Sequence, residues 1–208
     1  MGNHASSLLL LLCEATVASA VPSVSYALPQ GDQSVVALSP RGKLISSSVQ
    51  VDGRFGVAVA VSGKTVIVGA SLEDNSAGIN AGRAYVFEQF DNGTPFDRSD
   101  DSWPLTQGLP STPAPPLQAG DEFGAAVAVD LDTVVVGARV NGPGSVHVYY
   151  RNCAGPGWIA GPILVDPAGV TGDHFGAAVA IDGQTLVDRK STRLNSSHCA
   201  LSRMPSSA

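Results

Sequence analysis

The sequence lacks the features that mark several common classes of protein. It has no surplus of positive charge, since 12 Lys and Arg stand against 18 Asp and Glu for a net charge of −6. A nucleic-acid partner, which needs a basic surface for phosphate, is therefore not expected. No apolar run approaches the roughly 20 residues that span a bilayer, so no transmembrane segment is predicted. Aromatic residues are only 6% of the chain, whereas glycine and proline number 23 and 14. Because both residues favour turns and break helices, this composition predicts an all-β protein.

Cysteine is also scarce. The chain has three, Cys13, Cys153 and Cys199. The first lies in a predicted leader and the last in a C-terminal tail that we interpret below as foreign. Cys153 alone then remains, and a single cysteine cannot build an intrachain disulfide framework.

The first 20 residues have the pattern of a cleaved secretory signal. Leucines at positions 8–12 form a short apolar core, and Ala18-Ser19-Ala20 supplies the small residues that signal peptidase recognises. A lipobox ending at Cys13 and a myristoylation pattern beginning at Gly2 fit less well. The signal predicts a secreted or cell-surface protein.

Three segments of the chain repeat one pattern without gaps. They read RFGVAVAVSGKTVIVGA at 54–70, EFGAAVAVDLDTVVVGA at 122–138 and HFGAAVAIDGQTLV at 174–187. Each has Phe-Gly near its start and a threonine ten residues after the phenylalanine, and the first two end in Gly-Ala. Self-similarity of this kind indicates stacked copies of one small structural unit.

Each copy predicts a β-hairpin that is covered on both faces. Valine and alanine alternate over residues 57–61, and both parities are apolar. Ser62-Gly63 and Asp182-Gly183 predict two-residue turns of the primed type, in which glycine accepts positive φ. Asp130-Leu131 departs from that chemistry and predicts a less regular turn.

Two further strands follow each complete hairpin. Aromatic residues alternate with small or polar ones at 82–90 and 144–152, and Trp103 and Trp158 each precede another short apolar strand. Four short strands followed by a restart describe one blade of a β-propeller.

This pattern resembles the FG-GAP repeat, the blade of the integrin α-subunit propeller and of many secreted proteins. The resemblance covers residues 44–187, with two full copies and one cut short, and it implies an all-β partial propeller of four-stranded antiparallel blades. It assigns structural motif roles to Phe55, Gly56, Gly69, Ala70, Phe123, Gly124, Gly137, Ala138, Phe175 and Gly176. Residues 21–43 would belong to a preceding or closing blade. Because a propeller needs about four to eight blades to close, we expect these residues to be the front part of a longer protein.

Many members of that family carry a calcium loop between the first two strands of a blade. Here the corresponding positions read SGK, DLD and DGQ, and the spacing leaves room only for a tight hairpin. Asp130 and Asp132 are the nearest approach to a ligand pair, but two carboxylates cannot supply the six to eight oxygens that calcium takes. We predict no metal and no other cofactor at these sites, while blades beyond this segment could differ.

Two loops are candidates for contact with a partner. The first, LEDNSAG at 72–78, contains Glu73, Asp74 and Asn75, whose adjacent side chains point in different directions and so suit a surface loop better than a metal site. The second is the insertion at 91–116, rich in Pro, Ser and Asp, which we interpret as a mobile excursion. Asn92 opens a glycosylation sequon there, although Pro95 directly after it should lower occupancy.

No catalytic constellation is present in the sequence. His147 alternates within a strand, His174 occupies a variable column of the repeat, and neither has a partner at metal-ligand or triad spacing. Ser145 is not in a nucleophile elbow, because the G-x-S-x-G pattern is absent. The protein is therefore not expected to be an enzyme.

The last 21 residues break the repeat. After Val187 the register predicts Val-Gly-Ala, but the chain continues Asp188-Arg189-Lys190, and a strand buried on both faces should not run into three charges. DRKSTRLNSSH and SRMPSSA can both be reverse-translated into DNA that resembles a sequencing-library adapter. We interpret residues 188–208 as an artefact that does not belong to the native sequence.

These observations favour a non-catalytic module that binds a protein or glycan through the loops at one rim of the propeller. An accessory propeller of a larger extracellular hydrolase is the alternative, and a purely structural repeat protein is a third. The residues after Val187 in the native protein would distinguish them.

Overall fold

The structure is a computed structural model of the chain. It describes residues 12–13, 24–25, 37–38, 43–48, 50–93, 101–110, 117–140, 142–191 and 197–203. Every regular element in this part of the chain is a β-strand. The predicted signal at 1–20 lies outside the described residues, except for Leu12–Cys13.

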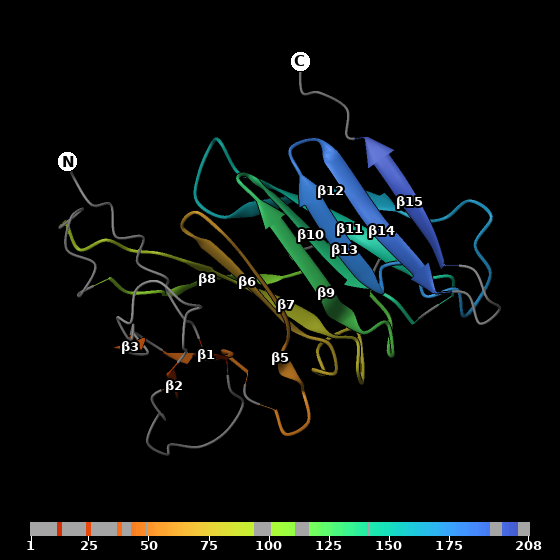
Figure 1. Cartoon of the computed structure of the whole chain (residues 1–208). Helices are drawn as coiled ribbons and strands as arrows, with labels where there is room; N and C mark the ends of the chain where they lie inside the picture. The colour runs from red at the N-terminus through yellow and green to blue at the C-terminus, as the bar shows by residue number, and fades with distance from the viewer. Residues whose placement is uncertain are drawn as a thin grey trace.

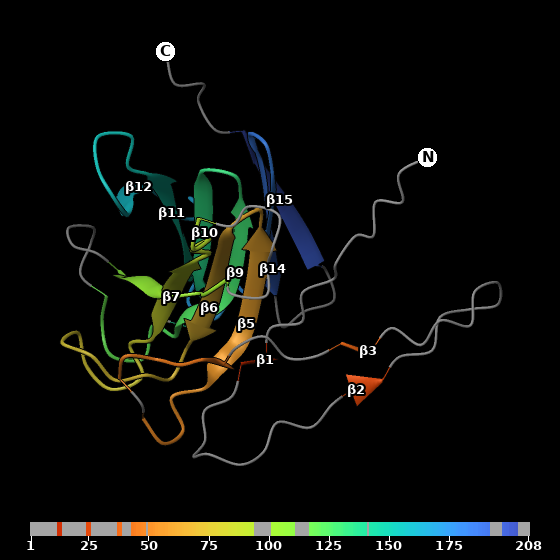
Figure 2. The ribbon, with the colours of Figure 1, turned by 90° about the vertical axis from the view of Figure 1, so that its left-hand side faces the viewer.

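Three antiparallel sheets follow one another along the chain and stack face to face (Figures 1 and 2). Blade 1 has the strand order β5-β6-β7-β8, blade 2 has β9-β10-β11-β12, and blade 3 has β13-β14-β15. Strand β9, the first strand of blade 2, contacts both β5 and β13, the first strands of blades 1 and 3. The predicted all-β architecture of four-stranded blades is confirmed, and the sheets do not close into a ring.

The strand bounds follow the repeat. Blade 1 comprises β5 (Phe55–Ser62), β6 (Thr65–Ala70), β7 (Arg83–Glu88) and β8 (Leu105–Leu109). Blade 2 comprises β9 (Phe123–Asp130), β10 (Thr133–Ala138), β11 (Ser145–Arg151) and β12 (Trp158–Leu164). Blade 3 comprises β13 (Ala178–Asp182), β14 (Thr185–Ser191) and β15 (Ser197–Arg203). Before them, β1 (Leu12–Cys13) pairs with β4 (Lys43–Leu44), and β2 (Val24–Ser25) pairs with β3 (Ala37–Leu38).

The three hairpin turns share one geometry. Ser62 pairs with Thr65 and Asp130 with Thr133, so the two-residue turns lie one position later than the sequence suggested. Their first residues have φ of 55° at Gly63, 47° at Leu131 and 54° at Gly183. The prediction of a less regular turn at Asp130-Leu131 is wrong, because the pairing of the flanking strands forces leucine into the conformation that glycine adopts elsewhere.

Alternation along the first strand gives each blade two different faces. We call the face with Val59 in blade 1 the valine face, and the opposite one, with Ala58 and Ala60, the alanine face. In blade 2 both are buried, with Val127 and Val129 on one side and Ala126 and Ala128 on the other. In blade 2, apolar residues at both odd and even positions of the first strand thus correspond to a sheet packed on both sides, as the sequence predicted.

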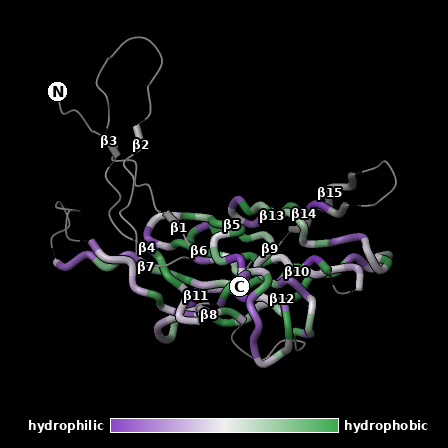
Figure 3. Tube along the Cα trace, turned by 90° about the horizontal axis from the view of Figure 1, so that it is seen from below, coloured by the Kyte–Doolittle hydropathy of each residue, from purple (hydrophilic) through white to green (hydrophobic). Residues whose placement is uncertain are grey.

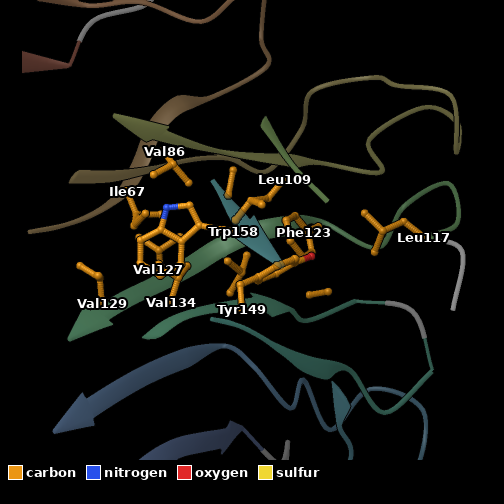
Figure 4. Close-up of a cluster of buried hydrophobic side chains, with 13 residues drawn as sticks. Ile67, Val86, Leu109, Leu117, Phe123, Val127, Val129, Val134, Tyr149 and Trp158 are labelled. Carbon is orange, nitrogen blue, oxygen red and sulfur yellow. The ribbon is translucent and has the colours of Figure 1, made fainter. Parts of the chain in front are cut away.

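The main core lies between the alanine face of blade 1 and the valine face of blade 2 (Figure 4). Ile67, Val86 and Leu109 come from blade 1, and blade 2 contributes among others Phe123, Val127, Val129, Val134, Tyr149 and Trp158. A second core repeats the arrangement between blades 2 and 3. Figure 3 shows hydrophobic residues along the packed strands and hydrophilic ones in many of the connections.

Strand β14 does not end at Val187, in contrast to the sequence-based expectation. It runs on to Ser191, because its backbone pairs with β13 and β15. Backbone hydrogen bonds form whether or not the side chains are charged. Asp188 takes the place held by Val68 and Val136 in blades 1 and 2, which are fully buried. Its carboxylate is also buried; Oδ1 accepts a hydrogen bond of 2.8 Å from Gly176 N, and Oδ2 has no partner. Burial raises the pKa of Asp188 from 3.8 to about 6.

Replacing Asp188 by valine should stabilise the chain by about 2 kcal/mol at pH 7, because an incompletely paired buried carboxylate opposes folding. A carboxyl group whose pKa is raised on folding carries no ionisation cost below its unfolded pKa of 3.8, and the full ionisation cost is reached above about 6. Urea unfolding should therefore show the gain of Asp188→Val becoming smaller as the pH falls through this window. Asp182→Asn, at an exposed site in the same hairpin, should change little. A loss of stability on Asp188→Val at pH 7 would contradict this account.

Candidate functional site

The motif residues form a joint between successive blades. The Gly69 Cα faces the backbone of Gly124 so closely that a Cβ on Gly69 would lie 2.0 Å from the Gly124 carbonyl oxygen. Gly124 itself has φ of 90° and abuts the carbonyl of Arg83. Gly82 forms a parallel bridge with Phe123 beside this contact. The Phe-Gly of one blade thus docks onto the Gly-Ala end of the blade before it.

Blades 2 and 3 are joined in the same way. A Cβ on Gly137 would lie 2.0 Å from the Gly176 carbonyl oxygen, and Gly144 bridges Phe175. Phe123 and Phe175 are buried, whereas Phe55, which has no described blade before it, is only partly so. These positions account for the spacing of the motif and identify its glycines as packing residues.

Polar clasps support the joint at both ends of the strands. On the hairpin side, Ser62 Oγ accepts from Leu131 N at 3.1 Å and Asp130 Oδ2 from Gly183 N at 2.7 Å. Asp132 accepts from Arg151 Nε at 2.8 Å. Both aspartates that were weighed as calcium ligands therefore have structural partners.

Two side chains, Arg151 of blade 2 and Gln107 of blade 1, reach across to the neighbouring blade. Arg151 donates to Glu88 at 2.5 Å and Thr65 at 2.9 Å, and its guanidinium lies 4.6 Å from the Trp158 ring centroid. Gln107 accepts from Trp158 N at 2.6 Å and donates to Trp158 O at 2.9 Å. Through these interactions blade 1 is linked to blade 2 at Thr65, Glu88 and Gln107.

The ends of the strands opposite the hairpin turns form what we call the loop rim. It consists of residues 50–54, 71–82, 118–122, 139–140, 142–144 and 170–174. Hydrogen bonds link successive blades across it, from Gly120 N to Ile79 O at 2.9 Å and from Gly172 N to Gly142 O at 3.1 Å. The loop rim is therefore a connected surface.

Glu73, predicted in a surface loop, is instead the buried centre of a polar cluster. Its Oε1 accepts from Tyr85 Oη at 2.5 Å and lies 3.0 Å from Arg83 Nε, and its Oε2 lies 3.4 Å from the donor Ser46 Oγ. Burial raises the pKa of the Glu73 carboxyl, although the tyrosine, arginine and serine partners lower it in part. Glu73 therefore anchors the loop and does not present a carboxylate to a partner.

Its two neighbours stay nearer the surface. Asp74 is exposed; its Oδ1 accepts from Asn80 N at 2.8 Å, and its N donates to Gln50 Oε1 at 2.6 Å. Asn75 is half-buried and donates to Gly82 O at 2.7 Å. The three predicted residues do not converge, and among the described residues no group of three or more His, Cys, Asp or Glu could hold a metal ion.

A serine–histidine contact within β11 went unnoticed in the sequence. Ser145 Oγ lies 3.0 Å from His147 Nε2, and the histidine packs edge-on against Phe123 with ring centroids 5.1 Å apart. His147 Nδ1 has no hydrogen-bond partner in the described structure, and burial lowers its pKa to about 4. An i, i+2 pair on one face of a strand could have suggested this contact. The pair lacks an orienting acid and lies in the core between blades, which suits packing more than nucleophilic catalysis.

The remaining candidates lie away from the loop rim or play structural roles. Asn92 is exposed in the connection between β7 and β8, at the hairpin side of the blade. Strand β8 divides the predicted insertion at 91–116, and residues 94–100 and 111–116 are outside the described part. His174 Nδ1 lies 3.0 Å from the Arg139 carbonyl oxygen and donates the hydrogen bond, because a carbonyl oxygen only accepts.

Comparison with known families agrees with this geometry. A family model described as FG-GAP repeat matches residues 39–87 and 114–149, which cover most of blade 1 and the first three strands of blade 2. The chain carries FG-GAP repeats. No curated protein matches the sequence. FG-GAP repeats are typical of extracellular proteins and of modules for adhesion and protein binding.

Within the described residues, no helix is long and apolar enough to cross a membrane.

Glu73→Leu should destabilise the protein by about 2–3 kcal/mol, because Tyr85, Arg83 and Ser46 would lose their shared buried acceptor. Asp74→Asn, which keeps an oxygen for Asn80, should stay within about 0.5 kcal/mol of the original chain. Urea unfolding at pH 7 measures both. Equal effects of the two substitutions would show that Glu73 is not the anchor of the loop.

Proposed function

We propose that this chain is part of a secreted or cell-surface propeller that binds another protein through the loop rim and catalyses no reaction. The observation that carries the proposal is a set of exposed aliphatic side chains on that rim, Val51, Ile79 and Val170. Single exposed apolar residues are ordinary on a protein surface, but several gathered on one rim are the material of an interaction site. Asp52 and Asp74, also exposed, add negative charge beside them.

The ordering of the rim supports binding as well. Gln50 and Asp74 exchange two hydrogen bonds, and the links between blades hold Ile79 and Gly142 in place through their carbonyls. A surface organised in advance loses less conformational entropy when a partner docks. The partner that complements it is a protein presenting apolar side chains flanked by Lys or Arg. A glycan remains the second candidate ligand.

The proposed non-catalytic role is supported by where the polar residues lie, because those weighed as catalytic or metal-binding groups have structural roles. Glu73 and His147 are buried in packing clusters, and Asp130 and Asp132 clasp neighbouring elements. The signal-like leader and the sequon at Asn92 support an extracellular location, in which glycan at Asn92 would leave the loop rim free.

The test is binding to panels of purified extracellular proteins and glycans, measured by surface plasmon resonance. Substituting Ile79 and Val170 with lysine should weaken the detected interaction at least about tenfold, since apolar contact is lost and positive charge faces a basic partner. Leu131→Lys is the matched control, because Leu131 is 72% exposed and Ile79 70%, but Leu131 lies at the hairpin side. The absence of any ligand, or equal loss with Leu131→Lys, would count against the proposal.

A further inference from the structure

One aromatic side chain at the hairpin side of blade 1 is open to solvent. In the part of the chain that the structure describes, Phe90 is the one aromatic among the large hydrophobic side chains left exposed, at 59%. A single exposed apolar residue is ordinary in itself. Phe90 stands out by its place, because it lies two residues before Asn92, which is also exposed and opens the sequon Asn92-Gly93-Thr94.

The repeat does not require an aromatic residue at this position. Phe90 N donates to Ser102 O at 2.8 Å, and at the equivalent point of blade 2 Asn152 N donates to Gly157 O at 2.9 Å. Both hydrogen bonds use only the backbone, and blade 2 fills the position with a polar side chain. The ring of Phe90 is therefore free for a role other than holding the blade together.

The backbone is expected to present Phe90 and Asn92 on the same side. Between them, Asp91 Oδ2 lies 3.8 Å from Lys64 Nζ, and Asp91 Oδ1 accepts from Gly93 N at 2.8 Å. Because side chains alternate along an extended chain, the two neighbours of Asp91 point away from Lys64. Gly93 has φ of 86°, and its N also donates to Asp91 O, so the chain turns at this point and leaves Asn92 on the outside.

The group that would lie against this ring is the first sugar of a glycan on Asn92. One face of an N-acetylglucosamine ring is lined by C–H bonds with partial positive charge, and the face of an aromatic ring is negative, so the two stack. Attachment is a group transfer from a lipid-linked oligosaccharide. Asn92 Nδ2 displaces the lipid diphosphate at C1 of the sugar: the C1–O bond breaks, the Nδ2–C1 bond forms and Nδ2 releases a proton. The short tether then holds the sugar at a high effective concentration beside Phe90.

We propose that Asn92 is a glycosylation site whose first sugar stacks on Phe90, and that the glycan thereby stabilises the connection between β7 and β8. The proposal rests on the extracellular location given under the proposed function. It does not rest on binding by the loop rim, which lies at the opposite ends of the strands.

The experiment expresses the full chain in mammalian cells behind a heterologous leader, so that glycosylation does not depend on residues 1–20. Every version carries Asn195→Gln, because Asn195-Ser196-Ser197 is a second sequon. Glycopeptide mass spectrometry should find glycan at Asn92. Because Pro95 lowers the occupied fraction, that fraction is isolated on a lectin column and trimmed by an endoglycosidase to a single N-acetylglucosamine.

Urea unfolding then compares each trimmed chain with its Asn92→Gln counterpart. With Phe90 present, the sugar should lower the unfolding equilibrium constant about fivefold, the size of one aromatic stacking contact. With Phe90→Ser the sugar should have no measurable effect. Phe90→Trp is the matched control that keeps an aromatic face, and it should restore the stabilisation. Without the sugar, Phe90→Ser should change stability little, because the side chain is largely exposed.

Three results would overturn the proposal. Absence of glycan at Asn92 removes the site, and equal stabilisation by the sugar in Phe90→Ser shows that the ring takes no part. A sugar that leaves the stability of the original chain unchanged shows that the two groups do not stack. The proposed function fails separately, if Ile79→Lys and Val170→Lys leave binding at the loop rim unchanged.

Discussion

The close approach of two glycine backbones at each blade junction determines how the blades of this structure pack on one another. Gly69 meets Gly124, and Gly137 meets Gly176, at a distance that admits no Cβ. Once the backbones are this close, the valine face of one sheet reaches the alanine face of the next and the two bury a shared core. The clasps by Arg151, Gln107 and the turn residues then act on blades that are already in register. Because each contact links only adjacent blades, stability is expected to accumulate junction by junction, as in other repeat proteins.

This constraint also explains where function can lie. The strand faces between blades are committed to packing, and Glu73 and His147 are buried. The connections at the loop rim are free to vary, with twelve residues at 71–82 in blade 1 and a much shorter segment in blade 2. A rigid stack that presents variable loops at one rim is the arrangement expected of a binding module.

The sequence was sufficient to predict the fold because the same pattern occurs three times in the chain. Phe-Gly and Gly-Ala, the alternation over 57–61 and the tryptophans predicted the strands to within a few residues. The errors arose where a distant partner decides the outcome. Leu131 adopts positive φ because β9 and β10 impose the register, and β14 continues past Val187 because β13 and β15 pair with it. Glu73 is buried by Ser46, Arg83 and Tyr85, which no local pattern connects to it.

The most direct test of the central claim is Gly137→Ala, measured by urea unfolding against Gly155→Ala. Gly155 is exposed, and the nearest atom to an added Cβ is a side-chain nitrogen of Asn152 at 3.4 Å, so this control should change stability by less than about 0.5 kcal/mol. At Gly137 the Cβ would meet a backbone carbonyl at 2.0 Å, and separating blades 2 and 3 to relieve it should cost about 3 kcal/mol. Equal stability of the two variants would contradict the account that the glycine contact holds the blades together.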